Sequence, residues 1–157
     1  MVLLPRTSYG SEPQPMDVPV LRKLAVALLT GACLFGAVAA YLPFLLDAPA
    51  PADAPSPEPD VDMVLLLSLV HGAVAVSSIG LSFLFRARAL SDPVEKSGLW
   101  LVRWALLEGA ALLGVVVVLF AGLQGAVPAN PLVYVNFASL AVFAVLVVLD
   151  LAAIGSD

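Results

Sequence analysis

Four long stretches of apolar residues constrain this chain more strongly than any other feature of its sequence. They cover approximately residues 24–46, 63–85, 99–123 and 132–154, and each is about as long as the ~20 residues that a helix needs to cross a bilayer. Hydrophobic residues make up 61% of the chain and charged residues 12%, whereas a soluble domain carries about 25% charged residues. The sequence therefore predicts an all-α integral membrane protein, with four transmembrane helices arranged as two antiparallel hairpins in a small bundle.

The segments outside the four spans predict the domain organisation. Residues 1–21 contain four prolines and are expected to form a disordered cytoplasmic tail, and residues 22–157 are expected to form the transmembrane domain. Residues 47–61 are expected to form an exterior loop, because their proline-rich and acidic sequence, APAPADAPSPEPD over 48–60, suits neither helix nor sheet. The short turn GAVPANP, residues 125–131, joins the last two spans as a hairpin.

The distribution of charge predicts how the chain is oriented in the membrane. The basic residues all lie in the N-terminal tail, in the connection between the second and third spans, or at the adjoining span ends: Arg6, Arg22, Lys23, Arg86, Arg88, Lys96 and Arg103. The loop between the first two spans contains several acidic residues and neither Lys nor Arg. Because cytoplasmic loops carry the excess of Lys and Arg, both termini of this multi-pass protein are expected to be cytoplasmic.

The first span also has an alternative interpretation, as a cleaved signal peptide. A basic pair, Arg22 and Lys23, precedes the apolar run, and the small residues Ala37-Val38-Ala39 resemble a cleavage site. The apolar run continues to Leu46, which is longer than the usual signal-peptide core, and this length favours a retained span. Cleavage would leave three spans and an exterior N-terminus, and the charge pattern of the remaining loops fits that arrangement as well.

One glutamate, Glu108, lies in the middle of the third span, in the segment WALLEGAALLG. A charged side chain at the centre of a bilayer costs roughly 2.5–3.5 kcal/mol on insertion scales. At about 1.5 Å per helical residue, Glu108 lies ~12 Å from Trp100, and Ser77 and Ser78 lie at a similar depth on the second span. We therefore expect a candidate intramembrane polar site that consists of Glu108, Ser77, Ser78 and His71, with Glu108 largely protonated at neutral pH.

Two residues of this candidate site, His71 and Glu108, each have a structural and a functional interpretation. His71 is expected to be satisfied by a backbone carbonyl or a hydroxyl group, and a proton-relay role is the alternative. Glu108 is interpreted as a functional residue, because intramembrane carboxylates usually mark ion or proton pathways. A protonated acid that fastens the helical hairpin through a serine hydroxyl is the alternative for Glu108.

Two further features concern how the spans meet. Asp150 lies near the cytoplasmic end of the fourth span and is expected at the interface, facing Arg103 or Arg22, rather than buried. Small residues recur at four-residue spacing, which permits close helix contact in a bilayer, although chance spacing in a chain rich in Ala and Gly explains such rows equally well. These rows are Ala32, Gly36 and Ala40 on the first span, Ala73 with Ser77 and Ser78 with Ser82 on the second, and Ala110 and Gly114 on the third.

The sequence favours no enzyme, cofactor or metal. It contains no Ser/His/Asp arrangement, no metal-ligand cluster and no phosphate-binding glycine loop, and its single cysteine, Cys33, excludes an internal disulfide. Nucleic acid is not an expected partner. The expected partners are the lipid bilayer and either a second copy of the chain or another protein of a membrane complex.

The segment from Arg86 to Gly122, which includes ALLEGAALLGVVVVLFAG, resembles the second half of the proton-binding c subunit of rotary ATP synthases. In that family the second helix of a hairpin carries one ion-binding carboxylate, and Glu108 occupies the matching place. The preceding helix lacks the dense glycines of c subunits and the chain has four spans instead of two, so the resemblance does not imply a rotary ring. The overall plan resembles small uncharacterised bacterial membrane proteins of four spans, whose third helix bears a segment like that from Arg103 to Gly109. This second resemblance implies a bacterial inner-membrane location.

Two functions from different classes follow from these observations. The favoured one is a structural or accessory membrane protein whose intramembrane polar residues fasten the helices to one another. The alternative is a small ion-coupling or transport component in which Glu108 is reversibly protonated within the membrane.

Overall fold

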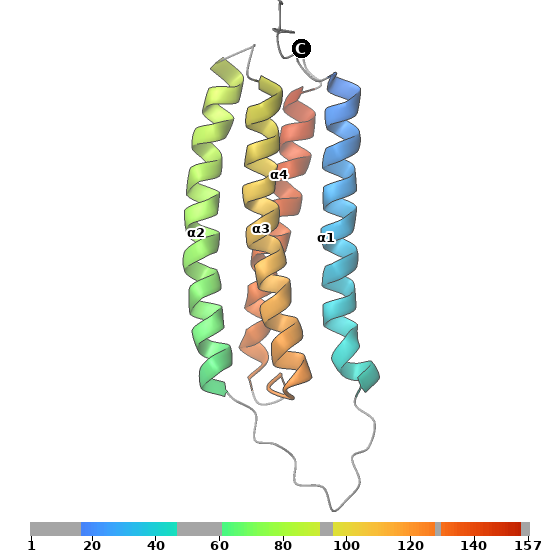
Figure 1. Cartoon of the computed structure of the whole chain (residues 1–157), viewed down its shortest axis with the longest axis vertical. Coiled ribbons are helices and arrows are strands. Elements are labelled where there is room, and N and C mark those ends of the chain that lie inside the picture. The colour runs from blue at the N-terminus through green and yellow to red at the C-terminus, as the bar shows by residue number, and fades with distance from the viewer. Residues whose placement is uncertain (1–16, 47–60, 92–95, 128–129, 155–157) are drawn as a thin grey trace, which may run out of the picture.

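The computed structural model describes residues 17–46, 61–91, 96–127 and 130–154 (Figure 1). Four long helices form within these ranges: α1 (Val18–Leu46), α2 (Val61–Ser91), α3 (Lys96–Leu123) and α4 (Ala138–Ile154). A 3₁₀ helix, η1 (Pro131–Phe137), leads directly into α4. The helices, with η1 and α4 taken together, are long and apolar enough to cross a membrane. The predicted all-α, four-span membrane bundle is therefore confirmed.

Local sequence explains where the helices begin and end. The backbone carbonyl of Asp17 accepts hydrogen bonds from the amides of Val20 and Leu21, and Pro19 occupies the first turn of α1, where no amide hydrogen is needed. Helix α3 ends before Gly125, whose φ of 66° is a conformation that glycine adopts without strain. Helix α1 thus begins inside the segment predicted as a tail. Residues 1–16 of that tail and the predicted exterior loop, apart from Val61 at the start of α2, lie outside the described residues.

Helix α3 is the centre of the bundle. Helices α1 and α2 lie on opposite sides of α3, and α4 packs behind it (Figure 1). Helix α3 has the largest buried share of the four spans. Its buried residues include Trp100, Trp104, Leu107 and Ala111, which pack with Phe143 and Val147 of α4 in the main apolar core.

A close contact between α1 and α4 depends on a glycine of the predicted small-residue row. A Cβ atom on Gly36 would lie 2.7 Å from Cδ2 of Leu140, which is closer than two carbon atoms can approach without movement. Ala32 and Ala39 on the same helix are also buried. In a bilayer, where lipid is as apolar as the helix surfaces, such small residues allow the helices to pack tightly.

The two ends of the bundle differ in charge. Helices α1 and α3 begin at the same end at which α2 and α4 finish (Figure 1). That end, which we call the basic end, therefore holds the basic residues of the described segments: Arg22, Lys23, Arg86, Arg88, Lys96 and Arg103. Helix α2 begins at the opposite end with Asp62 in its first turn.

Candidate functional site

The buried polar side chains of the described residues fall into two groups. Six polar residues are buried: His71, Ser82, Arg103, Asn136, Ser139 and Asp150. We call the first group the His71 network; it contains Ser68, His71, Asn136 and Ser139. We call the second group the Arg103 network; it contains Ser82, Arg86, Arg103, Trp104 and Asp150. Each network joins side chains from different helices, and together they include all six buried polar residues.

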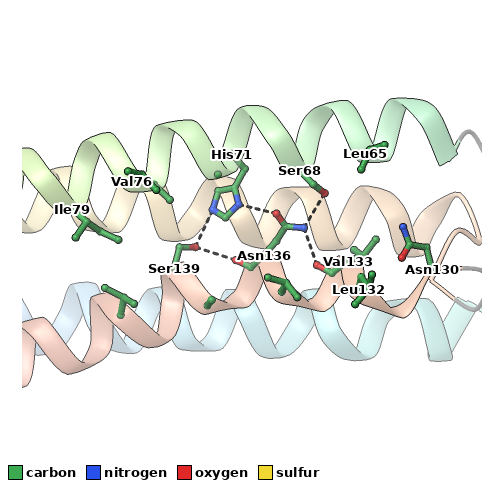
Figure 2. Close-up of a pocket in the computed structure, with 15 residues that line it drawn as sticks. Leu65, Ser68, His71, Val76, Ile79, Asn130, Leu132, Val133, Asn136 and Ser139 are labelled. Atoms are coloured by element: carbon green, nitrogen blue, oxygen red, sulfur yellow. Dashed lines mark hydrogen bonds between the residues drawn. The ribbon is translucent and has the colours of Figure 1, made fainter.

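The His71 network joins α2 to the start of the fourth span (Figure 2). Nδ1 of His71 lies 2.7 Å from Oδ1 of Asn136, and Nε2 of His71 lies 3.0 Å from Oγ of Ser139. The amide of Asn136 also donates to Oγ of Ser68 at 3.0 Å and to the carbonyl oxygen of Val133 at 2.8 Å. The 3₁₀ turn of η1 and the first turn of α4 therefore present Asn136 and Ser139 to the same histidine ring.

The neighbours of Asn136 determine where the protons lie in this network. The carbonyl oxygen of Val133 accepts only from the NH₂ side of the amide, so Oδ1 faces His71, and Nδ1 of His71 must be the donor. Nε2 then accepts a hydrogen bond from Ser139 when the imidazole is neutral, and donates to Ser139 when it is an imidazolium. In the second case Ser139 donates to the carbonyl oxygen of Asn136, 3.0 Å away. Rotation of one hydroxyl group thus accommodates either state of the histidine.

Gly114 of α3 lies directly against the His71 network. A Cβ atom at Gly114 would lie 2.7 Å from Nε2 of His71 and 2.8 Å from Oγ of Ser139, and it would also collide with the backbone oxygen of Asn136. The absence of a side chain at Gly114 therefore lets the three helices approach closely enough for the hydrogen bonds to form. The sequence left close contact and chance spacing equally open for this row, and at Gly114 the structure shows close contact.

A cavity of about 480 Å³ lies beside the His71 network, between α2 and the η1–α4 segment. Ser68, His71, Asn136 and Ser139 form part of its wall, and Asn130 lies at one end (Figure 2). The residues that line it include no Asp, Glu, Lys or Arg. The cavity is thus an uncharged space with a polar wall, and its size falls within the ~300–1,000 Å³ of small-molecule sites.

The Arg103 network joins α2, α3 and α4 nearer the basic end. Nε of Arg103 donates to Oδ2 of Asp150 at 2.6 Å, and Nη1 donates to the carbonyl oxygen and the hydroxyl oxygen of Ser82 at 2.6 and 3.0 Å. Nε1 of Trp104 donates to the same carboxylate oxygen of Asp150 at 3.2 Å. One arginine on α3 therefore holds α2 and α4 at once.

Asp150 faces two arginines. Its second carboxylate oxygen, Oδ1, lies 3.4 Å from Nε of Arg86, whose side chain is 38% exposed, whereas Asp150 and Arg103 are 0% exposed. Of the two predicted partners of Asp150, Arg103 and Arg22, the structure pairs it with Arg103, but the prediction that Asp150 is interfacial rather than buried is wrong. Its charge can be buried because Arg103 and Trp104 supply hydrogen bonds that replace water.

The residues of the predicted polar site lie in three different surroundings. His71 belongs to the network that bears its name. Ser77 is exposed and donates to the carbonyl oxygen of Ala73 on its own helix at 2.8 Å, and Ser78 is half-buried. Glu108 is also half-buried, and within the described segments no hydrogen bond or ion pair joins it to Ser77, Ser78 or His71.

Helical geometry explains the separation of Glu108 from the serines. Glu108 precedes Val115 by seven residues, so the two side chains lie on the same side of α3. Val115 faces α1, because a Cβ atom added to Gly36 of α1 would lie 3.8 Å from Cγ2 of Val115. Ser77 and Ser78 belong to α2, on the opposite side of α3 (Figure 1). Equal depth in the membrane therefore does not bring these side chains together.

Asn136 and Ser139 are not among the residues of the predicted polar site. A signal for them was present, because they are polar residues three apart in an apolar span, and residues at this spacing lie on the same helix face. Within the described ranges, no group of three or more His, Cys, Asp or Glu residues could hold a metal ion.

The fold and its two buried networks define the class of this protein as a four-span integral membrane protein. Comparison with protein-family models, curated proteins and solved structures found no match to the chain.

Proposed function

We propose that this protein is a structural or accessory component of a bacterial inner membrane, without catalytic activity, whose intramembrane polar residues fasten its helices in one arrangement. The observation that carries the proposal is that all six buried polar residues of the described segments belong to networks between helices. Buried polar groups in a lipid environment require such partners. Hydrogen bonds between helices join most members of these networks, although Nη2 of Arg103 and Oδ1 of Asp150 form no hydrogen bond with a described residue. We therefore assign these groups to connecting the helices.

The proposal includes an orientation, with both termini in the cytoplasm and the basic end of the bundle on the cytoplasmic side. The excess of Lys and Arg at one end supports it through the positive-inside rule. We also propose that the first span is retained and not cleaved, because Ala25, Ala32 and Ala39 of α1 are buried against the rest of the bundle.

Cysteine labelling tests this orientation. In a Cys33→Ala background, an Ala54→Cys variant should react with a membrane-impermeant thiol reagent in intact cells. A Ser91→Cys variant should react only after the cells are permeabilised, because we expect it on the cytoplasmic side. Reaction of residue 91 but not residue 54 in intact cells would overturn the proposed orientation.

A second candidate function is ion coupling through Glu108, and one observation favours it. Glu108 is half-buried on the side of α3 that faces α1, and it makes no hydrogen bond or ion pair with another described residue. An intramembrane carboxyl group that the bundle does not use as a fastener is available to exchange a proton. The resemblance of the segment 86–122 to the c subunit of rotary ATP synthases agrees with this candidate.

Proton flux separates the two candidate functions. The purified protein would be placed in liposomes that contain a pH-sensitive dye, and a potassium gradient with valinomycin would impose a membrane potential. The accessory function predicts that the wild-type protein and the Glu108→Gln variant both show the proton flux of protein-free liposomes. The coupling function predicts flux through the wild-type protein that Glu108→Gln abolishes, because glutamine keeps the hydrogen-bonding groups but cannot titrate.

A Ser77→Ala variant is the matched control, since it removes an exposed hydroxyl group at a similar depth on another helix. Flux that is lost in Glu108→Gln but kept in Ser77→Ala would contradict the accessory function. Folding of each variant would be checked by the fluorescence of Trp100 and Trp104, both of which are buried.

A further inference from the structure

The cavity beside the His71 network has hydrogen-bonding capacity that the bundle does not use. The side-chain amide of Asn130 caps no helix and forms no hydrogen bond with a described residue. Ser68 accepts a hydrogen bond from Asn136, and its own hydroxyl hydrogen is free to donate to another acceptor. Both groups line the cavity, so a bound molecule with a polar group at this end would find a donor and an amide.

The cavity becomes apolar along its length. Figure 2 shows Asn130 at one end, the His71 network in the middle, and Val76 and Ile79 at the other end. Ser68 follows Asp62 by six residues, which corresponds to ~9 Å along α2, and Ile79 lies a further ~16 Å along the helix. The Asn130 end of the cavity therefore lies toward the membrane surface at which α2 begins, and its other end, at Val76 and Ile79, lies beyond the middle of the predicted span 63–85.

Access to the cavity is lateral, from the lipid. The residues on its rim are largely exposed, with Val76 and Leu132 both 74% and Val135 65% exposed. These residues belong to spans that cross the bilayer, so this exposed surface faces acyl chains. A molecule dissolved in the membrane can enter between α2 and α4 with its polar group near the surface and its chain toward the bilayer centre.

We propose that this cavity binds a neutral amphipathic lipid, with a hydroxyl or carbonyl head that bonds to Ser68 and Asn130 and an apolar chain that lies against Gly72, Val76 and Ile79. A neutral head is required because no Asp, Glu, Lys or Arg lines the cavity. A phosphate or ammonium group would be desolvated there without a counter-charge, which is costly. This site goes beyond the proposed fastening function: Ser68 belongs to the His71 network as an acceptor from Asn136, and the ligand uses only its remaining hydroxyl hydrogen and the amide of Asn130.

Photocrosslinking in the intact protein tests the proposal. The probe is a long-chain fatty alcohol that carries a diazirine in its chain, and the matched probe has the same chain with a sulfate head. In nanodiscs, the alcohol should label α2 around Val76 and α4 around Val142 more strongly than the sulfate does. Unlabelled fatty alcohol should compete with this labelling.

Two variants examine the apolar and the polar part of the site. A Cβ at Gly72, which lines the cavity, or at Gly80, on the same helix outside it, would meet no atom within 4 Å. Gly72→Phe should therefore fill the cavity and lower labelling to the level of the other lipid-facing surfaces, whereas Gly80→Phe should not. Ser68→Ala should weaken competition by the alcohol about two- to tenfold, which corresponds to one lost hydrogen bond.

Equal labelling by the two probes would overturn the proposal, and so would labelling that is unchanged by both Gly72→Phe and Ser68→Ala. The proton-flux measurement concerns Glu108 on α3, and no residue of α3 lines the cavity. Failure of the lipid site therefore leaves the proposed accessory function unaffected.

Discussion

The Asp150→Leu variant is expected to lose about 3–5 kcal/mol of stability, the range found when a buried ion pair loses one partner. The reason is that Asp150 is the counter-charge of both Arg103 and Arg86. Arg103→Leu should cost less, because Arg86 remains 3.4 Å from the carboxylate. Titration of the purified protein in mixed micelles with a denaturing detergent, followed by tryptophan fluorescence, would measure the difference between these variants.

Two controls make this result specific to the ion pair. Arg88 lies on the same helix as Arg86 but is exposed and forms no ion pair with a described residue, so Arg88→Leu should leave the transition nearly unchanged. The double variant Arg103→Met/Asp150→Leu should be more stable than Asp150→Leu alone, since it leaves one fewer unpaired charge. A loss in Arg103→Leu that equals or exceeds that in Asp150→Leu would show that Arg86 does not share the charge.

Gly114→Ala is expected to destabilise the bundle by about 1–3 kcal/mol, the usual cost of an extra methyl group in a packed interior. The new Cβ would collide with the backbone oxygen of Asn136 and would also lie too close to His71 and Ser139. The backbone cannot move aside as a flexible side chain can, so the fourth span must shift and the hydrogen bonds of His71 must lengthen. The same detergent titration would measure the loss.

Two other glycines give a graded comparison for this prediction. A Cβ on Gly109, also in α3, would meet no atom within 4 Å, and alanine is the better helix former, so Gly109→Ala should be neutral or slightly stabilising. Gly36→Ala should have an intermediate effect, because its Cβ would meet the end of the Leu140 side chain, which can adopt another rotamer. Equal losses at Gly109 and Gly114 would contradict the role assigned to Gly114.

The last residues of three helices could be predicted from the sequence, because these apolar runs stop where proline, glycine or polar residues begin. The predicted spans 24–46, 99–123 and 132–154 end at the last residues of α1, α3 and α4, whereas α2 continues beyond the predicted span 63–85 to Ser91. The central position of α3 could not be predicted. In water, an apolar face of a helix points to the protein core, but in a bilayer the lipid is equally apolar, so hydropathy does not show which face is buried. The 3₁₀ geometry of η1 also has no clear signal in its apolar sequence.

The candidate site could be predicted only in part for the same reason. Depth along a helix follows from residue number, and this placed Glu108 level with Ser77. The direction of a side chain around the helix depends on which neighbour packs where, and α1 and α2 lie on opposite sides of α3. The Arg103–Asp150 pair could be predicted because the two residues carry opposite charges near the same end of their spans, and such charges attract each other. The hydrogen bond between His71 and Asn136 could be predicted only by someone who already knew that η1 lies beside α2.

The Arg103 network also has a consequence for how the chain enters the membrane. Arg103 is on the third span and its carboxylate partner is on the fourth, so a ribosome completes the arginine 47 residues before the aspartate. A lone charged residue makes insertion of an isolated helix unfavourable by roughly 2.5–3.5 kcal/mol when it lies deep in the bilayer. Neutralisation becomes available only when both spans are present, and the short connection between α3 and η1 keeps them together. Arg103 thus gains its carboxylate partner only after the fourth span has been synthesised.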